Sequence, residues 1–131
     1  MKFIYRLDYL NHSVGVAADG KVYKDSGNGF KLRTLKEGIA PEQFIQNRKN
    51  YKNSRPNYFA YADAVNAEFS KEEKEIYLIG VDMMGDDVDG IWSMLDDAGM
   101  NRDCEVLVRL NNLRKAAIIE KKNVDKVAAT N

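Results

Sequence analysis

The stretch Glu75-Ile-Tyr-Leu-Ile-Gly-Val-Asp82 contains an apolar run from Ile76 to Val81 that is interrupted only by Gly80. A short apolar run rich in β-branched and aromatic residues, closed by glycine and aspartate, is typical of a strand buried on both faces. We therefore predict a strand over residues 75–82. The fold predicted for the surrounding chain depends on this strand.

The residues after this run predict a helix and then a second strand. Asp86 or Asp87 is placed to cap the helix, and Gly99 fits the position just beyond its end. Residues 104–110 alternate as in a strand. Two strands joined by a helix of this length favour a parallel, right-handed β-α-β unit. The apolar side chains on one face of this helix are Val88, Ile91, Trp92, Leu95 and Ala98.

The N-terminal part of the chain predicts an antiparallel meander. Residues 2–10 alternate with a period of two, which indicates a half-buried strand. Residues 14–18 and 21–24 flank Asp19-Gly20, a dipeptide that favours a tight hairpin turn. Residues 30–35 fit a further strand.

Two helices are predicted between the meander and the central unit. Pro41 fits the first position of a helix that runs to about Lys52, and residues 57–69 place apolar side chains at helical spacing. After Leu110 two alternatives remain open. Residues 116–120 form a strand, or a helix runs from Leu113 to about Val127.

The predicted fold class is therefore α+β. We expect a single globular domain over residues 1–131, with its last four residues frayed. The order is an N-terminal antiparallel β-hairpin or meander, two helices, then a β-α-β unit followed by a C-terminal helix or strand. A chain of 131 residues can bury a core without disulfide bonds, which its single cysteine cannot form internally.

Composition also predicts the cellular compartment of the protein. A single cysteine fits a reducing compartment. The N-terminal apolar residues are broken by Arg6 and Asp8, unlike the apolar region of a signal peptide. No run approaches the ~18 apolar residues of a membrane span. We expect a soluble, cytoplasmic protein that is not secreted and does not contact a membrane.

Charge is unevenly distributed although the whole chain is neutral. Residues 59–105 carry 3 Lys/Arg against 13 Asp/Glu, a net charge of −10, whereas residues 1–58 and 106–131 are basic. Five aspartates fall on the half of the central helix opposite its apolar face. This face suits a basic partner surface, and the alternative is an ordinary solvated helix face. The five are Asp86, Asp87, Asp89, Asp96 and Asp97.

No convergent set of catalytic residues is visible in the sequence. The leading hypothesis is therefore a non-enzymatic binding protein, of the inhibitor or adaptor type, that occupies another protein and needs no cofactor. Small proteins encoded by viruses and mobile elements often have this profile. The pattern does not predict an oligomeric state.

A second hypothesis uses the aspartates as metal ligands. Asp82 is predicted at the carboxyl end of a strand, where ligands bind in open α/β sheets. With Asp86, Asp87 and Asp89 it would hold Mg²⁺ and activate water, as in a phosphoesterase or nuclease. The simpler interpretation is that these last three residues only stabilise the start of the helix.

A third hypothesis concerns residues 48–61, where basic and aromatic side chains are interleaved. Such a stretch can neutralise phosphates and stack on bases, which predicts a nucleic-acid or nucleotide site. The simpler interpretation is an exposed linker whose aromatic side chains pack inward. The candidate residues are Arg48, Lys49, Tyr51, Lys52, Arg55 and Tyr58.

Overall fold

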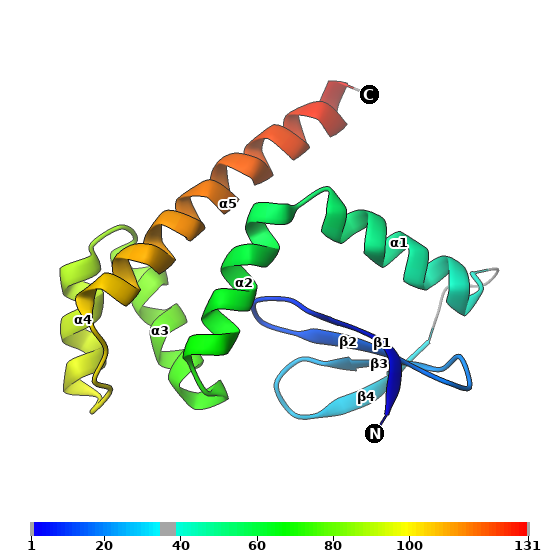
Figure 1. The fold of residues 1–131 in the computed structure, drawn as a ribbon, viewed down its shortest axis with the longest axis horizontal. Coiled ribbons are helices and arrows are strands. Elements are labelled where there is room, and N and C mark those ends of the chain that lie inside the picture. The colour runs from blue at the N-terminus through cyan, green and yellow to red at the C-terminus, as the bar shows by residue number, and fades with distance from the viewer. Residues whose placement is uncertain (1, 35–38, 131) are drawn as a thin grey trace.

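The N-terminal strands form one antiparallel sheet with the order β1-β2-β3-β4 (Figure 1). The structure is a computed structural model that describes residues 2–34 and 39–130. The predicted meander is confirmed, although the last strand ends at Arg33 and Leu35 lies outside the described residues. The strands are β1 (Phe3–Asp8), β2 (Ser13–Ala17), β3 (Val22–Asp25) and β4 (Phe30–Arg33).

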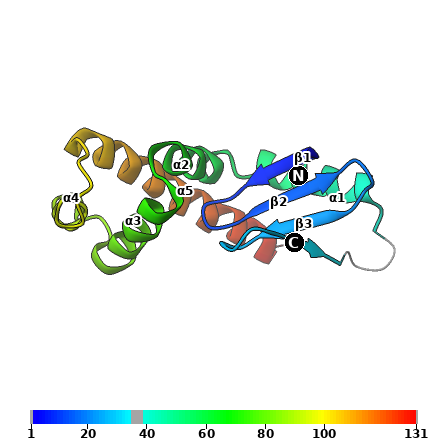
Figure 2. The ribbon, with the colours of Figure 1, turned by 90° about the horizontal axis from the view of Figure 1, so that it is seen from below.

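Helix α1 (Pro41–Asn53) lies across one face of this sheet (Figure 2). Side chains alternate across a strand, so each strand sends every second residue toward the helix. Phe44 of α1 and Phe59 of the next helix complete the small core beneath the sheet. The sheet contributes Leu7, Tyr9, Val14, Val16 and Val22 to this core.

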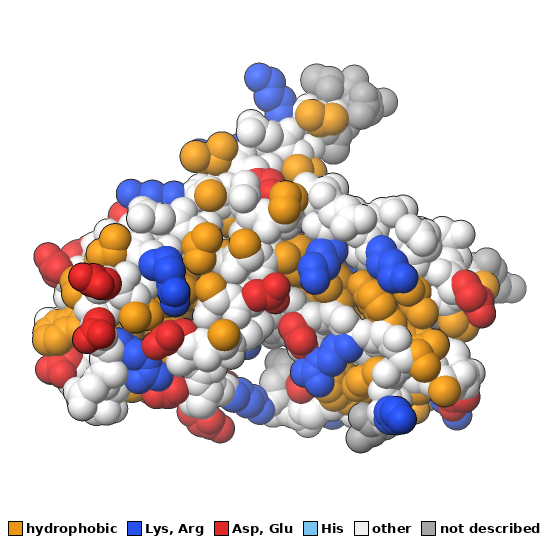
Figure 3. Space-filling model, viewed as in Figure 1, with side chains coloured by type: hydrophobic (Ala, Val, Ile, Leu, Met, Phe, Trp, Pro, Cys, Tyr) orange, Lys and Arg blue, Asp and Glu red, His pale blue; other side chains and the backbone are white. Residues whose placement is uncertain are grey.

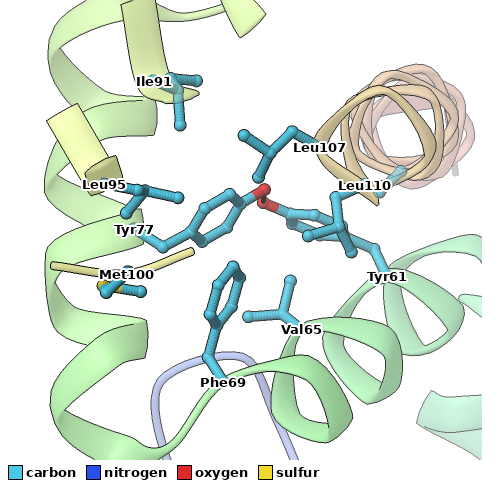
Figure 4. Close-up of a cluster of buried hydrophobic side chains, with 10 residues drawn as sticks. Tyr61, Val65, Phe69, Tyr77, Ile91, Leu95, Met100, Leu107 and Leu110 are labelled. Atoms are coloured by element: carbon cyan, nitrogen blue, oxygen red, sulfur yellow. Dashed lines mark hydrogen bonds between the residues drawn. The ribbon is translucent and has the colours of Figure 1, made fainter. Parts of the chain in front are cut away.

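The second half of the chain is a group of four helices (Figure 1). They are α2 (Pro56–Glu68), α3 (Lys71–Met84), α4 (Val88–Asp97) and α5 (Cys104–Thr130). α2 packs along α5, and α3 and α4 pack together at the end of the molecule away from the sheet. The helices predicted over residues 41–52, 57–69 and 88–98 are confirmed as α1, α2 and α4. Figure 4 shows the core that these four helices share.

The strand predicted over residues 75–82 is wrong, because these residues lie inside α3. The helix begins at a capping box in which the Ser70 hydroxyl accepts from the Glu73 backbone N–H and the Glu73 carboxylate accepts from the Ser70 backbone N–H. Tyr77 and Gly80 are buried, whereas Ile79 is 55% exposed. The apolar run lacks a helical period because it includes the exposed position Ile79 as well as the positions that pack against other helices.

The strand predicted over residues 104–110 is also wrong, because these residues begin α5. Leu107 and Leu110 are buried, but Val108 is 45% exposed. Burial therefore follows the spacing of a helix rather than the alternation of a strand.

The predicted β-α-β unit is consequently absent from residues 2–34 and 39–130, where the sheet is entirely antiparallel. The α+β class is correct. After Leu110 the helical alternative is correct, and the helix continues to Thr130, beyond the predicted end near Val127. Asn131 lies outside the described residues. Across the described residues, none of the helices has both the length and the apolar character needed to cross a membrane.

Candidate functional site

Acidic side chains gather over α3 and α4 (Figure 3). Among the described residues, two arginines form ion pairs here: Arg102 with Glu68 and Glu73, and Arg114 with Asp86. The basic segments over residues 1–58 and 106–131 therefore do not form ion pairs with most of these acidic side chains in the described residues. We call this region the acidic end, and define it by the exposed residues Glu72, Glu75, Asp82, Asp86, Asp87, Asp89, Asp96 and Asp97.

Some of the predicted partner-binding acids have a role within the fold. Asp87 is the N-cap of α4, and its carboxylate accepts from the Gly90 backbone N–H at 3.0 Å. Asp89 lies in the first turn, where a negative charge is favourable. Asp86 forms an ion pair with Arg114 of α5. Each of these three aspartates therefore has a role in the fold that requires no binding partner.

Asp96 and Asp97 have no such role. They lie in the last turn of α4, which contains no basic residue. A carboxylate at this negative end of the helix dipole is unfavourable by about 0.3–1 kcal/mol. Asp82 occupies the same kind of position at the end of α3. These acids are therefore placed where they do not stabilise their own helices.

The acidic end also exposes apolar side chains. Ile79 and Met83 lie one turn apart on α3 and are 55% and 71% exposed. Trp92 on α4 is 37% exposed, and its indole N–H donates to the Arg102 carbonyl oxygen at 2.8 Å. Methionine and tryptophan are enriched in protein interfaces, so the surface combines charge with suitable apolar contacts.

The placement of Asp82 at the edge of a sheet is wrong, because Asp82 belongs to α3. In the part of the chain that the structure describes, no group of three or more His, Cys, Asp or Glu side chains is placed to hold a metal ion. The magnesium site of Asp82, Asp86, Asp87 and Asp89 stays a prediction, without the strand end that motivated it.

A groove of about 630 Å³ brings together five elements: the turn between β1 and β2, α1, α2, α3 and α5. Its lining is basic and tyrosine-rich on one part and apolar on another. The residues that line it are Tyr9, Leu10, His12, Arg48, Tyr51, Arg55, Tyr58, Tyr61, Leu78, Val81, Arg114, Ala117, Ile118, Glu120, Lys121 and Asp125.

Four of the six residues predicted for a nucleotide or nucleic-acid site line this groove: Arg48, Tyr51, Arg55 and Tyr58. Lys49 and Lys52 are not in its lining. Their ammonium groups lie 5.9 Å from the Tyr5 ring and 6.0 Å from the Phe59 ring.

Aromatic side chains hold the two groove arginines Arg48 and Arg55. The Arg48 Nη1 atom donates to the Tyr9 hydroxyl at 2.8 Å. The guanidinium carbon of Arg55 lies 3.9 Å from the centre of the Tyr51 ring. Neither arginine forms an ion pair with a carboxylate of the described residues. Both are half-buried, and their positive charge is uncompensated by a direct partner.

The pKa of His12, which lines the groove, depends on the charges around it. Its ring stacks on Tyr9, with ring centres 4.0 Å apart. Burial lowers the pKa of His12, and the positive charges of Lys24, Arg48 and Arg33 lower it further. Burial and these nearby positive charges therefore both disfavour protonation of the imidazole.

The Glu120 side chain of α5 caps the N-terminus of α2. Its two carboxylate oxygens accept from the backbone N–H groups of Asn57 at 2.8 Å and Tyr58 at 2.9 Å. The N-cap residue of α2, Arg55, makes no capping bond with its own side chain. Glu120 thus supplies this cap from another helix, and its charge is engaged there.

No model of a known protein family, no curated protein and no solved structure matches this chain. The acidic end and the groove are therefore the features from which its function is proposed. Sequence reasoning missed the groove residues Tyr9, His12, Arg114 and Lys121, which no local pattern connects with residues 48–61.

Proposed function

We propose that this protein is a non-enzymatic binding protein, of the inhibitor or adaptor type, whose acidic end contacts a basic surface of another protein. The observation that carries this proposal is a group of exposed acids on α3 and α4, most of which form no ion pair within the described residues. The acidic segment gathers over α3 and α4, and in the described residues only Arg102 and Arg114 form ion pairs there. A surface of one sign steers and orients a partner of the opposite sign.

The positions of Asp96 and Asp97 support the same proposal. Acids that cap a helix are explained by folding alone, but these two oppose the dipole of α4. Residues that lower stability without a structural role are characteristic of binding sites, where function and stability compete. Exposed Trp92 and Met83 supply apolar contacts beside these charges.

The experiment is a capture of partners from a lysate of the cells that encode the protein, with the intact chain immobilised. We expect a partner to be retained at low salt and released at high salt, because exposed charges are screened by ions. The variant Asp96→Lys/Asp97→Lys is expected to lose this partner.

The matched control is Glu42→Lys/Asp63→Lys. It makes the same change in net charge at two exposed acids that lie on α1 and α2, outside the acidic end. The control is expected to retain the partner. Recovery of no partner at low salt, or equal recovery by both double variants, would contradict the proposal.

A further inference from the structure

We propose that the groove binds a nucleotide, with the phosphate on Arg48 and Arg55 and the base against the tyrosine-lined and apolar part. This site uses a different surface from the acidic end, and the inference does not rest on the proposed function. Four observations carry it: two fixed guanidinium groups, the balance of charge, the aromatic lining and the size of the groove.

The first observation is the arrangement of the two arginines. The Tyr9 hydroxyl takes one donor of Arg48, and the Tyr51 ring supports the flat face of Arg55. The Arg55 Nη1 atom also donates to the Ser54 hydroxyl at 2.9 Å. The remaining N–H groups of each guanidinium lie in its plane, and this planar fork matches the oxygens of a phosphate. Because both side chains are already positioned by aromatic neighbours, little side-chain freedom is lost when the anion binds.

The second observation is the balance of charge. Two of the six charged residues in the lining have partners in the fold: Arg114 pairs with Asp86, and Glu120 caps α2. Arg48, Arg55 and Lys121 then face a single acid, Asp125, and none of them forms an ion pair within the described residues. This excess of positive charge in a half-enclosed groove favours an anionic ligand.

The third observation is the lining around Tyr58 and Tyr61. The Tyr58 hydroxyl accepts from the Leu10 backbone N–H at 3.1 Å, and the Tyr61 hydroxyl is paired with Tyr77. The Tyr58 hydroxyl is already engaged, so its half-buried ring and the apolar neighbours can contact a flat base without burying an unpaired polar group. Tyr61 is only 3% exposed and belongs to the helical core. The apolar neighbours in the lining are Leu10, Leu78, Val81, Ala117 and Ile118.

The fourth observation is size. A volume of about 630 Å³ lies within the range of roughly 300–1,000 Å³ that is typical of small-molecule sites. It suits one nucleotide rather than a duplex. A free nucleotide and a nucleotide within a single strand present the same base and phosphate, so the experiment has to separate these two sources.

The experiment is isothermal titration calorimetry on the full chain at low salt. The probes are adenosine 5′-monophosphate, uridine 5′-monophosphate, adenosine, inorganic phosphate and a short oligothymidylate. We expect at least one mononucleotide to bind, and both adenosine and inorganic phosphate to bind at least about ten-fold more weakly. If the oligothymidylate binds about ten-fold more tightly than either mononucleotide and loses affinity steeply with salt, the source is a single strand.

Matched variants locate the phosphate. Arg55→Gln and Arg48→Lys are each expected to weaken binding by about ten-fold or more, because each removes charge-assisted or bidentate contacts. Lys52→Gln and Lys49→Gln, which change neighbouring cations outside the lining, are expected to stay within about two-fold. Lys121→Gln weakens binding while Lys122→Gln does not, and neither exposed lysine makes a contact that folding needs.

Far-ultraviolet circular dichroism of each variant shows whether it is folded. The proposal is overturned if the wild-type chain binds none of the nucleotide probes at millimolar concentration. It is also overturned if the Lys121→Gln and Lys122→Gln variants bind equally well, or if inorganic phosphate binds as tightly as the mononucleotides.

Discussion

The hydroxyl oxygens of Tyr61 and Tyr77 lie 3.0 Å apart at the centre of the helical core (Figure 4). One tyrosine belongs to α2 and the other to α3, so this hydrogen bond joins the two helices within the core. Burial raises the pKa of both tyrosines, and both therefore remain neutral. Each hydroxyl satisfies the other in a region otherwise lined by apolar side chains.

We expect Tyr61→Phe and Tyr77→Phe each to lower the free energy of unfolding by about 1–3 kcal/mol, because each leaves the other hydroxyl buried without a partner. The double variant is expected to be no less stable than either single variant, since it removes both polar groups. Urea unfolding of the four proteins forms a double-mutant cycle. Simple addition of the two losses would contradict the pairing.

Stability is expected to fall in mild acid because of His12. Its folded-state pKa lies below the ordinary value of 6.5, through burial and the charges of Lys24, Arg48 and Arg33. The unfolded chain therefore takes up this proton more readily than the folded protein. The contribution of His12 is fully present above pH 6.5 and is lost as the pH falls below it, toward the folded-state pKa.

The measurement is the urea midpoint between about pH 7.5 and pH 5.5. We expect a smaller decline in His12→Gln than in the wild-type protein. Glu73, whose pKa is lowered by its bond with the Ser70 backbone N–H and by Arg102, loses its contribution only below its ordinary value of 4.5. Its titration therefore lies outside this window. Equal declines in the two proteins would exclude His12 as the source.

Reversing the charge at the end of α4 is expected to stabilise the protein. Asp96→Lys/Asp97→Lys places positive charges at the negative end of the helix dipole, and the gain is about 0.3–1 kcal/mol for each residue at low salt. Thermal unfolding followed by circular dichroism measures it, and added salt should reduce it. Asp87→Lys serves as the opposite control, because it removes the N-cap and should lower the midpoint.

Loss of Glu120 is expected to destabilise α2 although the residue lies on α5. Glu120→Ala leaves the backbone N–H groups of Asn57 and Tyr58 without their acceptors, at about 1–2 kcal/mol. Asp125→Asn removes a nearby charge of the same helix that makes no ion pair in the described residues. Chemical unfolding should separate the two variants. An equal effect would mean that charge, and not the cap, is responsible.

The parts of the fold that the sequence predicted are those that short-range chemistry determines. Asp19-Gly20 supports a hairpin because Gly20 adopts a φ of +85°, and Gly99 ends α4 with a φ of +80°. Prolines at the first position of α1 and α2 mark both helix starts. In each case the residues that matter are neighbours in the chain.

The strand predicted over residues 75–82 is wrong because the apolar run of α3 extends beyond the buried side of the helix. Residues 76–81 are apolar without a helical period, because they include exposed Ile79 as well as positions that face α2, α4 and the groove. The capping box of Ser70 and Glu73 was a local sign of the helix, and it was present in the sequence. This local signal fixes the start of α3 and outweighs the strand-like composition of the apolar run.

The candidate sites also divide into features that the local sequence indicates and features that only tertiary packing creates. Residues 48–58 contribute four groove residues that composition alone picks out, but the opposite wall comes from α5, about sixty positions later. The excess of acids over residues 59–105 is visible in the sequence, whereas only the structure shows which of these acids form ion pairs with Arg102 and Arg114. The groove is therefore assembled by the packing of distant segments, whereas the acidic end comes from two consecutive helices.

The cap that Glu120 provides has a consequence for biosynthesis. On the ribosome α2 emerges 62 residues before the carboxylate that completes its first turn, an interval of several seconds at ~5–20 residues per second. Until then the nascent chain can form its sheet and α1, while α2 frays at its start and leaves Tyr61 and Val65 uncovered. The helical half of the molecule thus matures only after α5 has emerged.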